Sequence, residues 1–564
     1  MDAFYQRFPV AKGEIRLLTV QRSPRVCSFQ IARLGNNVPS YKAISYAWGD
    51  VSPARASEIQ VCGEGDGEKA RLPLSQTLAD MLQSLLRDHP TVTVWVDAIC
   101  INQADDTEKG VQVDQMGDVY SLAEQVVVWL GAATATSTAA FRFMETKRGL
   151  PWPDGWDALE KPELEGIDTV FLLLDRPWFR RLWVIQEVAL SSNVVVACGT
   201  ECIDFDDFET CVYAVWTFFE GLVDCYDDDE TLLGLWGITR LLLLRSEFHA
   251  HGAVAWETLL QAASQRLATD SRDKVFAFRS LAAEGRPMPG TDYSANTQPE
   301  KVYTDTAIAL LCHGESLDLL ALAGKARNAD SPLPSWVPDH RQFTWNEPFA
   351  LADGMGCHAG GPFRASPTLS PCGLDLLIKS VDWVARTSSQ FASGDVLHQQ
   401  MVVREVVSWR PSFRQQLPET DWLSLLATSL IFGLDIDDQP ADEEEYKQYF
   451  DEWYHWLMSS TSQVDLAMIK HNKFFRAIQP RVDTWRAFLS KQGYLGIGPP
   501  DVAVGDMLCV APGCRLPLIL RPTAKGPIQS PAVDMALISW CFLQGMMDGE
   551  ALAIGGAFSH VCLR

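Results

Sequence analysis

Three short apolar runs, each separated from the next by a helix-length segment, constrain the fold of this chain most strongly. The runs are YKAISYAWG at 41–49, TVTVWVDAICI at 91–101 and QVVVWLG at 125–131. Their β-branched and aromatic residues predict strands, and their low polarity is typical of parallel strands buried on both faces. Between them, apolar residues recur at helical spacing over 75–87 and over 107–123. This alternation predicts an α/β N-terminal domain with a parallel-type sheet and flanking helices.

The pattern changes after residue 204, and a chain of 564 residues is too long for one hydrophobic core. Apolar residues recur at helical spacing through 231–245 and 255–270, whereas glycine and proline turns separate strand-like runs between 505 and 552. The acidic run at 435–445 is typical of a solvated surface. The sequence therefore predicts three parts: an α/β domain at 1–204, a mainly helical region at 205–330, and a mixed α/β region with a β-rich end at 331–564.

Composition excludes several classes of function. Lys plus Arg is 47 against 72 for Asp plus Glu, a net charge of −25 without a local basic patch, so nucleic acid is not an expected partner. The 14 cysteines lack the paired spacing of zinc sites, which indicates reduced thiols and no metal. The first residues lack a signal-peptide core, and no later run approaches the roughly 18 apolar residues of a transmembrane helix. We therefore expect a cytoplasmic protein without an integral membrane segment.

Several stretches, in this order and spacing, resemble the fungal heterokaryon-incompatibility family, whose shared domain is called HET. In the first part of the chain they are YKAISYAWGD (41–50), the long stretch at 94–131, RPWFRRLWVIQEVALSS (176–192) and VVVACG (194–199). Further matching stretches are ATDSRDKVFAF (268–278), TDYS (291–294), LPSWVPD (333–339) and GMMDGE (545–550). The resemblance implies a fungal protein whose relatives trigger or regulate cell death when genetically different hyphae fuse.

HET domains are also similar to the TIR fold, a sheet with flanking helices. TIR domains self-associate, and some cleave NAD at the nicotinamide glycosidic bond. In RLWVIQEV (181–188), Trp183 and Glu187 match the W-x-x-x-E spacing of TIR domains whose glutamate is catalytic. The resemblance thus implies Glu187 as a catalytic residue and self-association as a possible activity. It implies no bound cofactor, with NAD as a possible substrate.

The chemistry expected of Glu187 follows from the reaction. Breaking an N-glycosidic bond passes through an oxocarbenium-like state, which one carboxylate can stabilise. Trp183 lies one helical turn before Glu187, so its indole could form a wall of the same substrate pocket. In the alternative interpretation, Trp183 packs in the core and Glu187 caps a helix or pairs with Arg180 or Arg181.

Asp97, in VWVDAIC, is the second catalytic candidate. A carboxylate near the end of an apolar strand must be hydrogen-bonded, paired or functional, and burial raises its pKa. The alternative is a structural Asp97 that accepts hydrogen bonds from backbone amides of the next loop. Cys100, three residues later, could act as a nucleophile beside a histidine, but a structural buried cysteine is the favoured interpretation.

Two strand ends supply candidate substrate-binding residues. Ser45, Tyr46 and Trp48 close the first strand, and ligands bind at the strand ends of open parallel sheets. Asn102 and Gln103 follow the second strand, where they could hydrogen-bond a ligand or cap the next helix. Ordinary strand packing is the alternative for Tyr46 and Trp48.

Arg272 and Asp273 form the best candidate motif outside the N-terminal domain, and a helix cap with a buried ion pair is favoured over catalysis. For the whole chain, two alternatives to an NAD-cleaving protein stay open. One is a self-associating signalling module without enzymatic activity. The other is a HET-like scaffold recruited as a cofactor-independent cyclase or hydrolase in a fungal biosynthetic pathway, with a small-molecule ligand.

Overall fold

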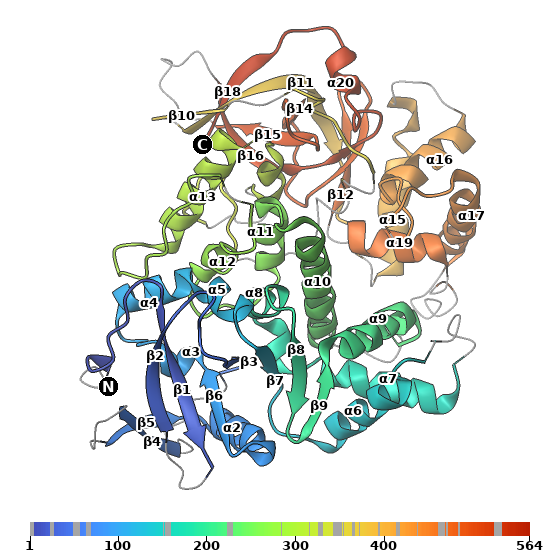
Figure 1. The fold of residues 1–564 in the computed structure, drawn as a ribbon. Coiled ribbons are helices and arrows are strands. Elements are labelled where there is room, and N and C mark those ends of the chain that lie inside the picture. The colour runs from blue at the N-terminus through green and yellow to red at the C-terminus, as the bar shows by residue number, and fades with distance from the viewer. Residues whose placement is uncertain are drawn as a thin grey trace. The chain divides into compact units, whose positions relative to one another are not determined.

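The structure is a computed structural model, shown in Figure 1, and its contacts divide the chain into two compact units. The first comprises 1–284 with 290–298, and the second comprises 285–289 with 299–564. The helical region expected at 205–330 is thus divided between the two units. The residues that the structure describes are 5–22, 27–48, 57–63, 69–150, 152, 159–222, 229–283, 285–314, 316–324, 331–341, 352, 355–363, 367–371, 373–392, 395–412, 418–436, 438–460, 469, 472–482, 485–523 and 533–564.

The described part of the first unit is built on a nine-stranded sheet with the order β5-β4-β2-β1-β6-β3-β7-β8-β9. The strands are β1 (Glu14–Gln21), β2 (Cys27–Arg33), β3 (Lys42–Tyr46), β4 (Ser57–Gly63), β5 (Lys69–Leu74), β6 (Thr91–Trp95), β7 (Gln125–Trp129), β8 (Val194–Cys198) and β9 (Glu201–Asp204). The predicted parallel arrangement is confirmed at the centre, where β6, β3, β7 and β8 run parallel. The sheet as a whole is mixed, because β1 pairs antiparallel with both β2 and β6, and β9 pairs antiparallel with β8.

Helices flank this sheet, as the sequence predicts, and Figure 1 shows them in blue to green. They are α2 (Gln76–Asp88), α3 (Asp97–Cys100), α4 (Asp106–Asp114), α5 (Met116–Ser121), α6 (Ala135–Lys147), α7 (Lys161–Leu173), η3 (Pro177–Arg180), α8 (Val184–Ala189), α9 (Phe205–Leu222), α10 (Asp229–His251), α11 (Trp256–Ser264) and α12 (Asp273–Phe276). Ser75 caps α2 by accepting a hydrogen bond from the backbone nitrogen of Leu78, as its position predicts.

The single helix expected over 107–123 is wrong, because the chain forms two helices, α4 and α5, that meet at Gln115. The side chain of Gln115 accepts a hydrogen bond from Gly13 N (2.8 Å) and donates one to Glu14 O (2.8 Å). These long-range bonds tie the break to the start of β1. Periodicity alone does not reveal such a break, because apolar spacing continues across it.

The order of the parallel strands fixes where a ligand site can form. Along the chain the strands follow as β3, β6, β7 and β8, but in the sheet β6 lies on one side of β3 and β7 on the other. The direction of winding therefore reverses at β3, and the crevice at the carboxyl ends of β3 and β7 is the expected ligand position in such sheets.

The second unit contains the predicted β-rich end. Its strands are β10 (Thr368–Ser370), β11 (Gly373–Thr387), β12 (Arg486–Ser490), β13 (Leu495–Gly498), β14 (Met507–Val510), β15 (Leu518–Pro522), β16 (Val533–Trp540), β17 (Phe542–Leu543) and β18 (Ser559–Leu563). Among the described residues, β14, β15, β16, β18 and β11 pair in a closed ring, because β11 pairs with both β18 and β14. Register shifts after Ser380 and Val384 bend the long strand β11, which allows this closure.

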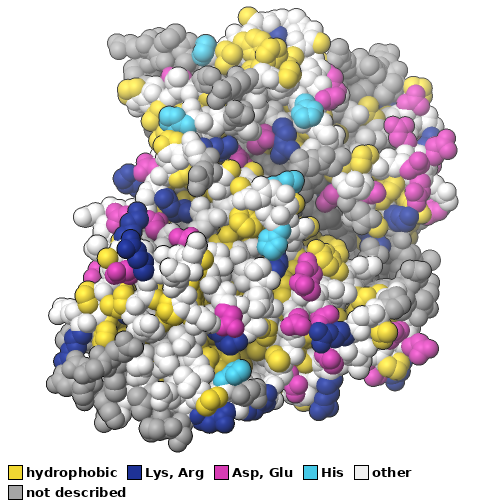
Figure 2. Space-filling view, in the orientation of Figure 1, with side chains coloured by type: hydrophobic (Ala, Val, Ile, Leu, Met, Phe, Trp, Pro, Cys, Tyr) yellow, Lys and Arg dark blue, Asp and Glu magenta, His cyan; other side chains and the backbone are white. Residues whose placement is uncertain are grey.

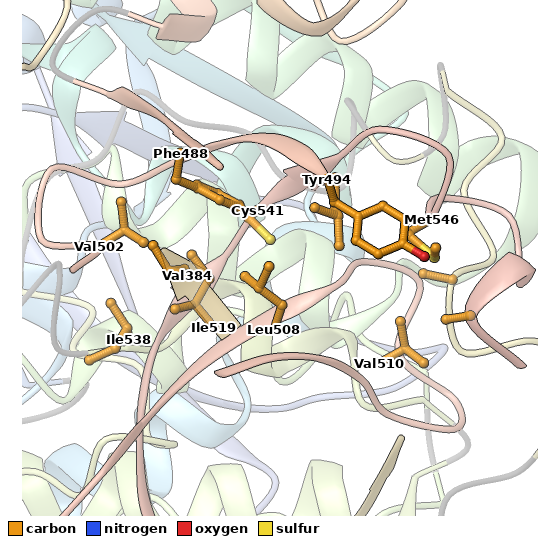
Figure 3. Packing of buried hydrophobic residues seen from close by; sticks show 13 residues of the cluster. Val384, Phe488, Tyr494, Val502, Leu508, Val510, Ile519, Ile538, Cys541 and Met546 are labelled. Atoms are coloured by element: carbon orange, nitrogen blue, oxygen red, sulfur yellow. The ribbon is translucent and has the colours of Figure 1, made fainter. Parts of the chain in front are cut away.

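The interior of this barrel is apolar. Figure 3 shows Val384, Leu508 and Ile519 lying side by side in a cluster that also includes Phe488 and Ile538, all of them buried. Each such side chain stabilises the fold by roughly 1.5–3 kcal/mol relative to exposure.

Helices make up the rest of the second unit. They are α13 (Pro299–His313), η5 (Asp318–Leu322), α15 (Val396–Val407), η6 (Arg410–Ser412), α16 (Glu419–Leu430), α17 (Glu443–Ser459), α19 (Lys473–Val482) and α20 (Glu550–Ala553). The acidic first turn of α17 is exposed, as the sequence predicts, and Figure 2 shows acidic side chains gathered over this helix. No helix within the described ranges is long and apolar enough to cross a bilayer.

Candidate functional site

Glu187 and Ser45, both predicted from the sequence, meet at the end of β3. Glu187 lies in α8 and is 2% exposed, while Ser45 is fully buried. The Ser45 hydroxyl donates a hydrogen bond to Glu187 Oε2 and accepts one from Trp178 Nε1 (2.8 Å). The hydroxyl therefore joins the carboxylate to the indole of η3, next to the point where the strand order reverses.

The surroundings of Glu187 raise the pKa of its carboxyl group above the ordinary value. Burial raises its pKa to about 7, although the positive charge of Arg181 and the hydrogen bond from Ser45 oppose this shift. The negative charge of Asp97 raises the pKa further. Near neutral pH both the protonated and the ionised form are populated, as proton transfer to or from a carboxylate requires.

Asp97 begins α3, directly after β6, and is partly buried. Trp48 Nε1 donates to Asp97 Oδ2 (2.9 Å), and the backbone nitrogen of Ala98 donates to Oδ1 (2.7 Å). Burial raises the pKa of Asp97, and the charge of Arg181 opposes this rise. The predicted raised pKa and the alternative of backbone hydrogen bonding are thus both present.

Arg181 is the positive charge that acts on both carboxylates. Its guanidinium donates to the carbonyl oxygen of Tyr46, and the side chain of Tyr46 is buried. Within the described residues, no ion pair joins Arg181 to Glu187 or Asp97, although its charge lowers the pKa of both carboxyl groups. We call Ser45, Asp97, Trp178, Arg181 and Glu187 the Glu187 cluster.

The side chain of Trp183 bonds to Asp273 rather than to the carboxylate of Glu187; Glu187 and Trp183 share only the helical backbone hydrogen bond from Glu187 N to Trp183 O (3.1 Å). The indole Nε1 of Trp183 donates to Asp273 Oδ2 (3.0 Å), and the hydroxyl of Tyr293 donates to Asp273 Oδ1 (2.6 Å). Burial raises the pKa of Asp273 to about 6. Arg272 forms the N-cap position of α12 and pairs with Asp270 (2.7 Å).

The second pair of predicted binding residues is divided between two places. Gln103 is exposed, and its Nε2 donates to Asp97 O (3.0 Å), next to the Glu187 cluster. Asn102 is buried and lines a separate cavity. Cys100 is fully buried, and burial raises the pKa of its thiol to about 12, which favours the structural interpretation over a thiolate nucleophile.

Two cavities lie beside α4 in the first unit. One, of about 320 Å³, is open to one side and is lined by residues from the segment 5–12, by Asn102 and Asp105, and by one face of α4; we call it the N-terminal cavity. The other, of about 280 Å³, lies between the outer face of α4 and residues 291–294. Neither is lined by a member of the Glu187 cluster. Because Glu187 is almost fully covered, a substrate reaches it only after its neighbours move.

Two members of the Glu187 cluster were not among the predicted site residues. The sequence suggests Arg181 only as an ion-pair partner of Glu187, and it assigns no separate role to Trp178 within the stretch 176–192. The run RPWFRRLW at 176–183 signals a dense mixture of aromatic and basic side chains. The run does not indicate which of its indoles donates to Ser45, because the direction of the Trp178 side chain depends on the conformation of η3.

Comparisons with known proteins agree with the sequence resemblance. The profile of the family "Heterokaryon incompatibility protein (HET)" matches residues 41–187, and that of the "Het-6 beta-barrel domain" matches residues 436–554. The "Heterokaryon incompatibility protein 6, OR allele" of Neurospora crassa is 27% identical over 628 aligned positions, covering 91% of this chain and 90% of the relative. No solved structure matches the chain. The expected likeness to the TIR fold gains no support from these comparisons.

Proposed function

We propose that this chain, whose residues 41–187 belong to the heterokaryon incompatibility (HET) family, acts in fungal heterokaryon incompatibility and its regulated cell death. The observation that carries the proposal is the similarity to the Neurospora crassa incompatibility protein. It extends over 91% of this chain and 90% of the relative, so it includes the region that matches the β-barrel profile as well as the HET domain. Relatives that share every domain share function more often than relatives that share one domain.

Inducible expression of the full chain in Neurospora crassa tests this role. Transformants are fused with a panel of wild isolates, and uptake of a vital dye in the fused compartments is counted. We expect death in fusions with at least one isolate, and none with a matched vector that carries an early stop codon. Viable fusions with every isolate, at protein levels confirmed by immunoblot, would overturn the proposal.

As the chemical basis of cell death, we infer that Glu187 supports hydrolysis of NAD at the nicotinamide glycosidic bond. In this reaction the bond between the ribose C1′ and the pyridinium nitrogen breaks, and neutral nicotinamide leaves with the electron pair. A water oxygen then bonds to C1′ and loses a proton. A carboxylate with a pKa of about 7 at the reversal of the strand order is suited to stabilise the oxocarbenium-like state and to accept this proton.

The covered position of Glu187 sets a condition on this activity. With 2% of its surface exposed, Glu187 contacts NAD only in a rearranged or assembled state of the HET domain. Purified full chain should therefore release nicotinamide from NAD under crowding conditions that promote assembly, and Glu187→Gln should reduce the rate at least tenfold. If the wild type is inactive under these conditions, or if Glu187→Gln is equally active, the proposal of NAD hydrolysis by Glu187 is contradicted. The proposed role in incompatibility does not depend on this result.

The buried hydrogen bond between Ser45 and Glu187 favours a second candidate, in which the network is structural and the HET domain acts only by self-association. In that case Glu187→Gln still kills on expression and the purified chain forms oligomers. Expression of Glu187→Gln beside wild type, with sedimentation velocity on both proteins, separates the two candidates.

A further inference from the structure

We propose that the N-terminal cavity is a binding site for a small, uncharged, ring-shaped amide, independent of the Glu187 cluster and of the proposed function. The cavity holds about 320 Å³, whereas one water molecule takes up roughly 30 Å³ of liquid. Its volume lies at the lower end of the range for ligand pockets, which begins at about 300 Å³. A single ring with its polar substituents is therefore the expected size of ligand.

Gln112, on the wall of this cavity, offers an unused hydrogen-bond acceptor. The residue is 1% exposed, and its Nε2 donates to the carbonyl oxygen of Glu14 (2.9 Å). Its Oε1 is buried and has no hydrogen-bond partner. A buried polar atom without a partner is uncommon in folded proteins. Because Gln112 lines the cavity, a ligand there would supply the missing donor once the wall shifts enough to expose Oε1.

Asn102 supplies the complementary donor. It is 7% exposed, and its Oδ1 accepts a hydrogen bond from Ala104 N (3.2 Å). Because the amide oxygen is engaged in this turn, the orientation of the side chain is fixed and its Nδ2 is left as a donor. Within the described residues Nδ2 makes no hydrogen bond, so the cavity wall presents one free acceptor and one free donor.

A buried ion pair holds these two groups in place. Glu108 accepts two hydrogen bonds from Arg16 (2.5 and 2.9 Å) and one from the backbone nitrogen of Asn102 (2.7 Å). Gln112 lies one turn after Glu108 on the same face of α4. Asn102 and Gln112 therefore flank a fixed carboxylate, which limits the positions that their amide groups can take.

The charges around the cavity favour a neutral ligand. Two backbone N–H groups in the first turn of α4, at Thr107 and Glu108, already donate to Asp105 Oδ1 (2.9 and 3.1 Å), so they are not available to an anion. Lys12 and Asp105 carry opposite charges and Arg16 pairs with Glu108, so the lining has no excess charge of either sign, and Pro9 and Val10 provide apolar surface. The ligand class that fits is a neutral ring carrying an N–H donor for Gln112 and a carbonyl acceptor for Asn102.

Two sources of this chemistry are distinguished by two probes: uracil, whose amide lies within the ring, and nicotinamide, whose carboxamide is a substituent. Binding of each to the full chain is measured by isothermal titration calorimetry and by saturation-transfer NMR. We expect at least one of them to bind. Asn102→Asp keeps the Oδ1 acceptor of the turn and replaces the Nδ2 donor by oxygen, so it should weaken binding at least tenfold.

Val10→Phe, on the opposite wall, should block the cavity and abolish binding without touching the polar groups. Gln83→Glu on the exposed face of α2 makes the same amide-to-carboxylate change outside the cavity and should bind like wild type. If Asn102→Asp fails to fold, Val10→Phe decides the matter alone. Failure of both probes to bind folded wild type, or binding that neither cavity variant changes, overturns the proposal.

Discussion

Single residues in the Glu187 cluster carry measurable energies because they are buried. The Ser45 hydroxyl has two partners, the carboxylate of Glu187 and the indole N–H of Trp178, and all three side chains are shielded from water. A buried donor that loses its partner costs about 1–3 kcal/mol, more than the net gain from a typical hydrogen bond. Each of these residues should therefore affect stability as well as any activity.

Ser45→Ala should lower the free energy of unfolding by about 1–3 kcal/mol, because the N–H of Trp178 is left without an acceptor and Glu187 loses its donor. Urea unfolding followed by tryptophan fluorescence measures the change. Ser121→Ala, at an exposed serine in α5, is the matched control and should change the free energy by less than about 0.5 kcal/mol. Equal effects of the two substitutions would contradict the account of the cluster.

The raised pKa of Glu187 predicts a dependence of stability on pH. The pKa is about 7 in the folded state and 4.5 for the ordinary group, so between these values the folded chain binds more protons than the unfolded chain. The contribution of Glu187 to stability is therefore lost as pH rises from about 4.5 to 7, by about 3 kcal/mol in total.

Glu187→Gln removes this titration and keeps an acceptor for Ser45. The variant should gain stability over wild type by about 3 kcal/mol between pH 4.5 and pH 8, measured as the difference in unfolding free energy at the two values. A difference that does not change with pH would mean that Glu187 titrates normally.

At the scale of elements, segment 290–298 belongs to a different unit from the residues next to it in the sequence. It belongs to the first unit, although the residues before and after it belong to the second. The guanidinium of Arg272 donates to the carbonyls of Ser294 and Thr297, both at 2.9 Å, and so holds the segment in place. Lys109 of α4 lies 4.0 Å from the ring centre of Tyr293. Segment 290–298 is thus anchored mainly by side chains of the first unit.

Tyr293→Phe tests this anchoring. It removes the hydroxyl that donates to Asp273, whose carboxylate then keeps the indole of Trp183 as a side-chain donor. We expect a loss of about 1–2 kcal/mol in unfolding free energy and faster amide exchange in segment 290–298. Tyr213→Phe, at an exposed tyrosine of α9, should leave both quantities unchanged.

At the scale of the whole molecule, the two profile matches fall in different units, with the HET match in the first and the barrel match in the second. Each unit has its own sheet and its own buried apolar residues. On the face in view in Figure 2, acidic and basic side chains are interspersed, with no continuous basic area. On this face, the described residues thus form no evident phosphate-binding region, in keeping with the net charge of −25.

This charge predicts that the full chain does not bind nucleic acid. Fluorescence anisotropy with a labelled random-sequence duplex in 0.15 M salt should show no binding up to micromolar protein, because phosphate contacts supply most non-specific affinity. A basic peptide known to bind the same duplex serves as the positive control. Binding that weakens steeply with added salt would reveal a basic surface and contradict the prediction.

Sequence patterns determined the central strands and their flanking helices. The runs at 42–46, 91–95 and 125–129 are strands because β-branched and aromatic residues fill pleated, buried positions, and this preference is local. The same patterns predicted the β-rich end and the exposed acidic turn of α17. The motif resemblance predicted the HET domain, which the profile match confirms. These patterns could not predict that the helical segment 107–123 breaks at Gln115, because the break depends on a contact with the start of β1.

Only the tertiary structure decided which predicted residues meet. Ser45 and Glu187 are 142 positions apart and share a hydrogen bond, whereas Trp183 donates to Asp273 and Asn102 lines a different cavity from the Glu187 cluster. Spacing along a strand or helix fixes which side chains share a face. It does not fix which groups from distant segments satisfy one another, because that depends on how the sheet winds and which polar atoms it buries.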